Sequence, residues 1–495
     1  MNKRVYVAID LGASGGRVIA GWIEDGEIKL DILHRFDNGP VFTDGVFRWP
    51  WSAILDGIRV GMMEAGRRFG AALRSVGVDT WGVDYGLVDC EGRLRSEPVA
   101  YRDTRTDGMM EQVFAQAPRD EVYRITGIQF LGFNTLYQLM AERNAGEGLG
   151  RAEHLLFIPD LIHAWLSGVA VNEYTIASTS QMLDVQTRDW SSRLLNVVGA
   201  PRRLFPRLVM PGDVIGTLRS EWARAWGIPD MRVVAPPSHD TASAVVAVPF
   251  VDSESVYLSS GTWSLMGVEL PEPMTGEAAY RYGFTNEGGA YHTIRLLKNI
   301  CGMWIIQECR KAWMAGGEPL SFEQIRAESN QAPPFVSFID PDDPVFATPG
   351  DMPARIQAYC RETGQPVPLT RGAMARCVFE SLAMRYRAVL GMLEDLTGRT
   401  YQRIHIVGGG AMNEVVNQYT AEATGREVEA GPVEATSLGN LAVQMISDGV
   451  VADLAEARAM IRRSTDLQLF APRQPEIWRR AYEGYIKATA ATSRL

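Results

Sequence analysis

The sequence predicts an α/β protein of two domains whose halves follow one plan. Its 495 residues exceed what a single hydrophobic core supports. Each half opens with a short apolar run, a turn of small residues and a second apolar run, at residues 5–23 and again at 255–268. The recurrence indicates an internal structural duplication, and we place the boundary between residues 248 and 249.

The first half begins as an antiparallel meander. Apolar runs at residues 5–10, 18–23 and 28–36 predict three strands, with Gly26 in the turn between the second and the third. A dinucleotide-binding fold would instead pass directly from its first strand into a helix. The periodicity then predicts a helix over residues 51–69 and a buried strand over 75–84, whose polar end is of the kind that lines clefts in α/β sheets.

Later segments continue the α/β pattern. A strand is expected at residues 233–235, just before a polar cluster that ends in small, helix-compatible residues. Helical spacing predicts helices over 303–315 and 371–396. A strand at 404–407, a glycine turn and a helix from about residue 413 complete the pattern.

Composition and charge favour small-molecule partners. A formal net charge of -10 argues against nucleic-acid binding, which requires clustered Lys and Arg. The most apolar stretch, residues 155–171, is interrupted by Pro159, Asp160 and His163, so no membrane span is predicted. The first residues lack a signal-peptide core, and the five cysteines form no CxxC pair, so we expect a cytoplasmic protein with reduced thiols.

Three glycine-containing turns are candidates for binding phosphate. They cover residues 12–16, 259–262 and 408–410, and each adjoins an apolar strand-like run. Backbone N–H groups can cradle phosphate only where no Cβ blocks the approach. There is no GxxxxGK[ST] loop, and Asn413 stands where a dinucleotide motif needs its third glycine. The turns therefore predict a hairpin-type phosphate clamp.

Two acids are the main candidates for chemistry. Asp10 ends a buried strand beside the first glycine turn, where a carboxylate could hold a hydrated Mg²⁺, although it could also cap the turn. Asp240 lies in the polar cluster after the strand at 233–235 and could serve as a helix N-cap. Phosphoryl transfer to a hydroxyl needs a carboxylate that accepts its proton, and we assign that role to Asp240. The six histidines lack zinc-site spacing, and only His239 adjoins a reactive group.

Taken together, several segments resemble the FGGY carbohydrate kinases over nearly the whole chain. They are residues 8–17, 79–84, 101–105, 127–130, 133–135, 238–244, 258–267, 285–289 and 405–410. The resemblance implies a two-domain actin-like ATPase fold, a ribonuclease H-like duplication with an active-site cleft between the domains. It also implies ATP- and Mg²⁺-dependent phosphorylation of a sugar, L-rhamnulose at O1, in L-rhamnose breakdown.

Carried over by position, the resemblance assigns a role to particular residues. Asp240 is expected to be the base, and Asp10 to hold Mg²⁺ through water. The positions expected to contact the sugar are Gly82, His239, Asp240, Thr241 and Asn299. The positions expected to contact ATP are Ala13, Ser14, Gly15, Gly16, Arg17, Thr262, Gln307 and Gly409. Gly15 departs from the family's pattern, where a serine is expected.

Alternatives remain within and beyond this class. Sugar and ATP are the expected partners, with no nucleic acid and no membrane, and the chain could be a monomer or a homodimer. Another ketose or polyol, such as L-fuculose, could be the acceptor, because a few buried polar contacts decide stereochemistry. A non-catalytic actin-like nucleotide-binding module would need the phosphate turns but would not require Asp240 or Asn299.

Overall fold

The structure is a computed structural model that describes residues 3–146, 149–229, 231–317 and 319–490. The chain begins with the predicted meander. Strands β1 (Val5–Leu11), β2 (Gly15–Glu24) and β3 (Glu27–Asp37) pair antiparallel in sequence order. Asp25 and Gly26 both have positive φ in the two-residue turn before β3, as the twist of a tight hairpin demands. The predicted hairpin-first topology is confirmed.

The chain forms two compact units that interleave in sequence. The first unit comprises the residues up to Pro249 together with Glu269–Leu297 and Ala435–Thr465. The second comprises Phe250–Val268, Lys298–Glu434 and the residues from Asp466 onward. Two segments of the C-terminal half therefore complete the core of the first unit.

The first unit is built on a six-stranded mixed sheet of order β13-β14-β6-β1-β2-β3. Beside the meander it contains β6 (Leu73–Thr80), β14 (Arg232–Val234) and β13 (Val214–Thr217). β6 lies parallel to both β1 and β14, and all seven residues of β1 are buried. The predicted strand over 75–84 is too long: it ends at Thr80, and Val83 adopts a φ of 67° that extended backbone excludes.

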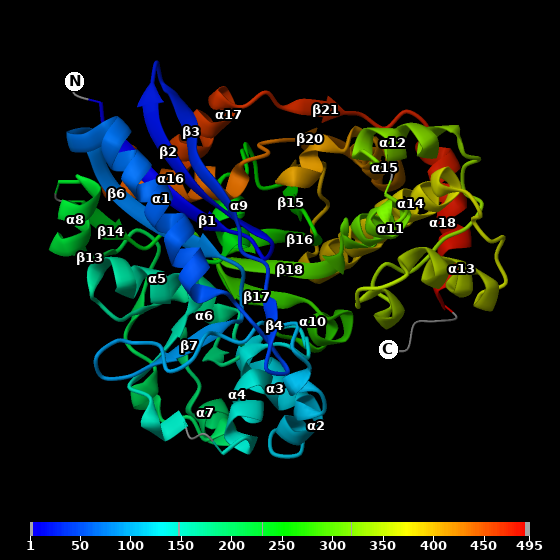
Figure 1. Ribbon diagram of the computed structural model, residues 1–495. Helices are drawn as coiled ribbons and strands as arrows, with labels where there is room; N and C mark the ends of the chain where they lie inside the picture. Colours follow the sequence, from blue (N-terminus) through cyan, green and yellow to red (C-terminus); the bar gives the residue numbers. More distant parts are fainter. Residues whose placement is uncertain (1–2, 147–148, 230, 318, 491–495) are drawn as a thin grey trace. The chain divides into compact units, whose positions relative to one another are not determined.

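Helices cover both sides of this sheet. α1 (Trp51–Phe69), at the predicted bounds, lies along β2 and β3 (Figure 1) and buries Ile54, Ile58 and Met62 at helical spacing. α16 (Ala435–Ser447) packs on β1, β6 and α9 (Asp240–Val246). The other helices of the unit are α2 (Met109–Phe114), α3 (Arg119–Thr126), α4 (Thr135–Asn144), α5 (Ile158–Ser167), α6 (Tyr174–Ser178), α7 (Ser192–Val198), α8 (Ser220–Trp226), α10 (Glu277–Tyr282) and α17 (Leu454–Ser464).

Short strand pairs lie outside the main sheet of the first unit. One of them is the antiparallel pair of β17 (Thr285–Gly288) with the first half of β18 (Ile294–Cys301). The others are β4 (Val41–Thr43) with β5 (Val46–Arg48), β7 (Tyr85–Val88) with β8 (His154–Phe157), β9 (Asn172–Glu173) with β12 (Leu208–Val209), and β10 (Leu183–Asp184) with β11 (Asp189–Trp190).

The second unit repeats the strand plan of the first. β15 (Ser255–Ser260) pairs antiparallel with β16 (Trp263–Leu270) and parallel with β19 (Arg403–Val407), as β1 pairs with β2 and β6. β20 (Glu427–Ala430) continues in parallel and β21 (Gln468–Phe470) closes antiparallel, like β14 and β13. This correspondence is the duplication expected from the sequence.

Among the described residues of the second unit, six α-helices are present. The predicted helices over 303–315 and 371–396 are α11 (Trp304–Met314) and α14 (Arg371–Thr397), which are confirmed within a residue or two at each end. α14 packs against α12 (Phe322–Gln331) and α15 (Glu414–Thr424). The remaining two are α13 (Met352–Glu362) and α18 (Pro475–Ala490).

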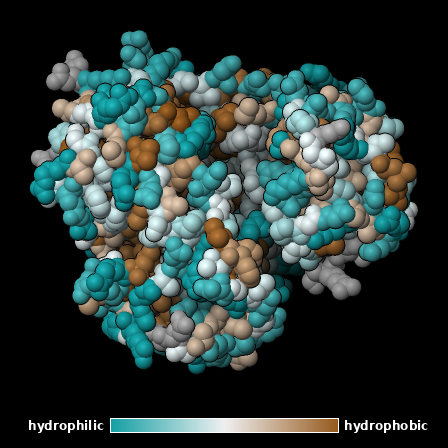
Figure 2. Space-filling model, in the orientation of Figure 1, coloured by the Kyte–Doolittle hydropathy of each residue, from teal (hydrophilic) through white to brown (hydrophobic). Residues whose placement is uncertain are grey.

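On the face drawn in Figure 2, hydrophilic side chains predominate and apolar ones are scattered in small groups. No helix in residues 3–146, 149–229, 231–317 or 319–490 combines the length and the hydropathy needed to cross a bilayer.

Candidate active site

Three buried or partly buried carboxylates gather at the ends of β1, β6 and the segment before α9. Asp10 on β1 lies directly beside Asp79 on β6 in the parallel register, because both strands end at the same sheet edge. The carboxylates of Asp10 and Asp240 both raise the pKa of Asp79, although burial is the larger cause. The predicted metal residue and the predicted base therefore belong to one cluster of acids in the first unit.

Asp10 is closely held by its neighbours. Its Oδ2 accepts hydrogen bonds from Arg17 Nη2 at 2.6 Å and from Ser437 Oγ at 2.5 Å. Arg17 faces Asp10 across the β1–β2 hairpin, so the ion pair joins the two strands that flank the first glycine turn. Ser437 lies in α16, far along the chain, and no local pattern in the sequence signals its contact with Asp10.

Asp79 has one oxygen bound and one without a partner. Its Oδ2 accepts from Asn440 Nδ2 at 2.6 Å, whereas Oδ1 is buried and has no hydrogen-bond partner among the described residues. A buried polar atom of this kind calls for a ligand, a water or an ion. Asp79 stands in the motif at residues 79–84, and the sequence alone assigns it no role.

Asp240 is the first residue of α9, and His239 occupies the N-cap position. The alternative that Asp240 itself is the N-cap is therefore wrong. Its Oδ1 accepts from Thr241, through the backbone N–H at 2.6 Å and the hydroxyl at 3.2 Å. Burial raises the pKa of Asp240, the Asp10 carboxylate adds to the rise, and His239 and Thr241 oppose it. About a third of the Asp240 side chain is exposed, so it can reach a bound molecule.

The residues expected to contact sugar separate into two groups. Thr80 donates its N–H to Ser238 O at 2.8 Å and bridges to His239, so the end of β6 lies beside the loop that precedes α9. Gly82 follows in this strand-end segment, and Thr241 lies in the first turn of α9. Asn299 is half-buried in the part of β18 that belongs to the second unit.

Two of the three predicted phosphate turns lie together in the second unit. An added Cβ on Gly410 would come within 2.0 Å of Ser260 Oγ, so the turn at 408–410 packs directly on the end of β15. Thr262 Oγ1 lies 3.4 Å from Gln307 Oε1, and the Trp304 N–H donates to Thr262 O. Gly409 has open space around its Cβ position. Thr262, Gln307 and Gly409 thus border one small-residue surface at the start of α11.

The third predicted turn connects β1 to β2 in the first unit. The Gly12 N–H donates to Gly15 O at 3.0 Å, and Asn38 Nδ2 donates to Gly12 O at 2.8 Å, which fixes a tight turn. Ala13 and Ser14 lie at its tip, with Ser14 exposed, and β2 begins at Gly15. A Cβ on Gly16 would collide with the Phe36 ring and with Leu11, so this glycine is required by packing.

The acids suit a hydrated magnesium ion better than a fully protein-ligated one. Among the described residues, no group of three or more His, Cys, Asp or Glu side chains is arranged to hold a metal. Magnesium prefers oxygen ligands and keeps several waters. Asp10 and the partnerless Oδ1 of Asp79 offer such oxygens at adjacent strand ends, so this pair fits the ion.

The structure adds residues that sequence reasoning missed. Glu173, at the end of β9, accepts from the Ser238 N–H at 3.1 Å and from Thr175 Oγ1 at 2.6 Å. Thr175 Oγ1 in turn accepts from the His239 N–H at 3.2 Å. The loop before Asp240 is therefore held from its backbone by a buried glutamate, which no spacing motif in the sequence signals.

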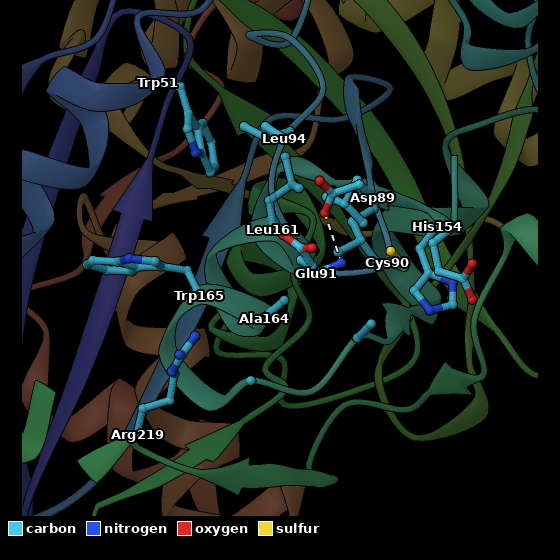
Figure 3. A pocket seen from close by; sticks show the side chains of 16 residues that line it. Trp51, Asp89, Cys90, Glu91, Leu94, His154, Leu161, Ala164, Trp165 and Arg219 are labelled. Atoms are coloured by element: carbon cyan, nitrogen blue, oxygen red, sulfur yellow. Dashed lines mark hydrogen bonds between the residues drawn. The ribbon is translucent and has the colours of Figure 1, made fainter. Parts of the chain in front are cut away.

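A separate cavity of about 510 Å³ opens elsewhere in the first unit. Figure 3 shows it between the indoles of Trp51 and Trp165 and the turn that carries Asp89 and Glu91. Asp89 is bound by Arg93, and Arg219 at the opposite end is paired with Glu221. None of the residues predicted to bind sugar or nucleotide lines this cavity.

Comparisons with known proteins show the family to which the chain is similar. Residues 5–247 match the N-terminal domain model of the FGGY family of carbohydrate kinases, and residues 256–447 match its C-terminal domain model. A curated rhamnulokinase from Bacteroides thetaiotaomicron is 44% identical over 97% of this chain and 98% of its own length. One from Bacillus subtilis is 41% identical over 95% and 96% respectively.

Solved structures support the fold. A gluconate kinase from Lactobacillus acidophilus superposes with a TM-score of 0.82 at 15% identity, covering 99% of this chain and 98% of its own. A Plasmodium falciparum glycerol kinase with ADP gives 0.77 at 13% identity, covering 100% and 99%. The two-domain α/β fold predicted from the sequence is confirmed.

Proposed function

Because the chain belongs to the FGGY family of carbohydrate kinases, we propose that it transfers the γ-phosphoryl group of ATP to O1 of L-rhamnulose. The observation that carries this proposal is the likeness to rhamnulokinases over nearly the whole chain. The products are L-rhamnulose 1-phosphate and ADP. We assign the base and most of the sugar contacts to residues 1–248, and nucleotide binding to residues 249–495 together with the turn at residues 13–17.

Asp240 is the general base of the proposed reaction. Its carboxylate accepts the proton of the O1 hydroxyl as the new bond to phosphorus forms. Burial and the nearby Asp10 raise its pKa, which makes it a better proton acceptor than an ordinary aspartate. His239 and Thr241 lie beside this carboxylate. Contacts with the sugar are assigned to these two residues, to Gly82 and to Asn299.

The small-residue turns bind the phosphates of ATP. Thr262, Gln307 and Gly409 hold the nucleotide in the second unit, and Ala13, Ser14, Gly15, Gly16 and Arg17 contribute from the first. Their backbone N–H groups need close approach, which the open space at Gly409 allows. Asp10, through water, and Asp79 would hold Mg²⁺, and the bound ion would neutralise charge on the phosphates.

A phosphate-transfer role is favoured over a nucleotide-binding module. Such a module would not need a carboxylate whose pKa is raised by burial and by a second acid.

The described helices include no membrane span, and all five cysteines are free thiols, which supports a cytoplasmic location.

A panel of sugars tests the substrate. ADP release is measured with L-rhamnulose, L-fuculose, D-xylulose and glycerol at fixed ATP and Mg²⁺, and the phosphorylated position is read by ³¹P and ¹³C NMR. We expect the highest kcat/KM with L-rhamnulose and phosphate on O1. A higher kcat/KM with any other acceptor would assign the enzyme to that substrate instead.

A further inference from the structure

His239 is held from two sides within the first unit. Its backbone N–H donates to Thr175 Oγ1, as described above, and its ring Nδ1 lies 3.1 Å from Arg295 Nη2 and 3.2 Å from Glu287 Oε2. The other ring nitrogen, Nε2, lies 3.5 Å from Asp240 Oδ1. One nitrogen is thus anchored, and the other faces the catalytic carboxylate.

The anchor is a buried ion pair across two strands. Glu287 on β17 and Arg295 on β18 are directly opposite each other in the antiparallel register, and Arg295 Nη2 donates to Glu287 Oε2 at 2.9 Å. The Arg295 side chain is fully buried and Glu287 is 7% exposed. Burial tends to raise the pKa of Glu287, but Arg295 and His239 outweigh it and hold the pKa below its ordinary value.

The hairpin that carries this pair is fixed to the elements around His239. Arg295 Nε donates to Gly288 O at 2.9 Å, and the Gly288 N–H donates to Ser178 Oγ at 2.8 Å on α6. A Cβ on Gly288 would come within 2.5 Å of the Tyr174 ring, so the strand lies directly against α6. The same short helix supplies Thr175, which binds the backbone of His239.

Fold stability alone does not explain the pair. Desolvating two charges costs about as much as their attraction returns, and packed apolar residues often serve stability better. Arg295 Nη1 is buried and lacks a hydrogen-bond partner in the described part of the chain, which adds to that cost. A pair retained at this cost next to a reactive loop points to a positioning role.

We propose that Glu287 and Arg295 are positioning residues, which hold the His239 ring so that Nε2 faces the sugar and Asp240. The inference rests on the proposed function, in which His239 contacts the sugar. It also gives a role to the segment at 285–289, which carries part of the family resemblance and received no role from sequence reasoning.

Kinetics of Glu287→Gln provide the main test. We expect kcat/KM for the sugar to fall about 10- to 100-fold, as when the groups that orient a ligand are lost, with KM for ATP nearly unchanged. Glu269→Gln is the matched control, because Glu269 and Arg458 form a similarly buried pair in the same unit at 2.5 Å. The control should lose stability without losing sugar turnover.

Two further variants separate positioning from folding. The double variant Glu287→Gln, Arg295→Met lacks both charges, so its Tm should be closer to that of the wild type than the Tm of Glu287→Gln alone. Its kcat/KM for the sugar should remain low. In a His239→Ala background, Glu287→Gln should cause no further loss, because its effect passes through His239. Additive losses, or wild-type kcat/KM in Glu287→Gln, would overturn the proposal.

A readout that does not depend on turnover separates this inference from the proposed function. In protein labelled with ¹⁵N-histidine, the six histidines allow the His239 imidazole signal to be assigned with His239→Ala. That signal should shift in Glu287→Gln and not in Glu269→Gln. A wild type inactive on every sugar would reject the function alone, whereas an unmoved His239 signal would reject the positioning role.

Discussion

The two units place different chemistry at the ends of the same strand plan. In the first unit, β1 and β6 carry Asp10 and Asp79 near their ends, and Asp240 lies near these two acids. In the second, β15 and β19 end in the turns at 259–262 and 408–410, which consist of serine, glycine and threonine. One duplicated framework thus supports a cluster of carboxylates in one copy and turns of small residues in the other.

The difference reflects what each bound group requires. A carboxylate is a more effective proton acceptor near neutral pH when its surroundings raise its pKa, and burial among other acids does so at a cost in stability. Phosphate oxygens need close backbone N–H donors, and a Cβ would keep them away. The buried acids therefore lower the stability of the first unit, whereas the glycines in the turns of the second unit carry no Cβ that would keep a phosphate away.

Asp240→Asn is the sharpest test of the acid side of the comparison, and it carries the largest expected effect. Asparagine keeps the shape and can accept from Thr241, so folding and ATP binding should persist while kcat falls by about 10³-fold for want of a proton acceptor. Coupled ADP release gives kcat, and calorimetry gives ATP affinity and Tm. Activity within a few-fold of the wild type would remove Asp240 from the mechanism.

The sequence predicted the strands and helices better than the side-chain hydrogen bonds that hold the acids in place. Alternating apolar runs and a Gly-containing turn predict the β1–β2–β3 meander, because local pattern and burial agree there. The sequence points to Asp10 because it ends a buried strand beside a glycine turn, and to Asp240 because it follows a strand in a polar cluster. Ser437, the partner of Asp10, lies 427 residues away along the chain, and Glu173, which binds Ser238 in the loop before Asp240, lies 65 residues from Ser238. Nothing in a single sequence signals such long-range contacts.

Two neighbouring glycines test the steric side of the comparison. Gly409→Ala adds a methyl group in open space, so Tm should hardly change, but KM for ATP should rise about 10-fold if the backbone there approaches phosphate. Gly410→Ala pushes a Cβ against Ser260 and should instead lower the free energy of unfolding by about 1–3 kcal/mol. Thermal melts and ATP titrations of both variants separate the two effects. A Gly409→Ala enzyme with unchanged KM would exclude that glycine from the nucleotide site.

Glu173→Gln tests whether the buried acids of the first unit cost stability. Burial raises the pKa of Glu173 to about 7, against hydrogen bonds from Thr175, Ile176 and Ser238. Between the ordinary pKa of 4.5 and 7, the unfolded chain has lost this proton and the folded one keeps it. Raising the pH therefore lowers the free energy of unfolding, by about 3 kcal/mol once both pKa values are passed.

Glutamine carries no charge, and its amide oxygen can accept the same three hydrogen bonds. The variant should therefore match the wild type near pH 5 and melt about 5 °C higher near pH 8, as differential scanning calorimetry would show. Glu121→Gln is the control: Arg193 lowers the pKa of Glu121, so that variant should gain nothing as the pH rises. A Tm difference between Glu173→Gln and the wild type that stays constant from pH 5 to 8 would mean that Glu173 is ionised throughout. The loss of stability attributed to the acids of the first unit would then have to reside in Asp79 and Asp240 alone.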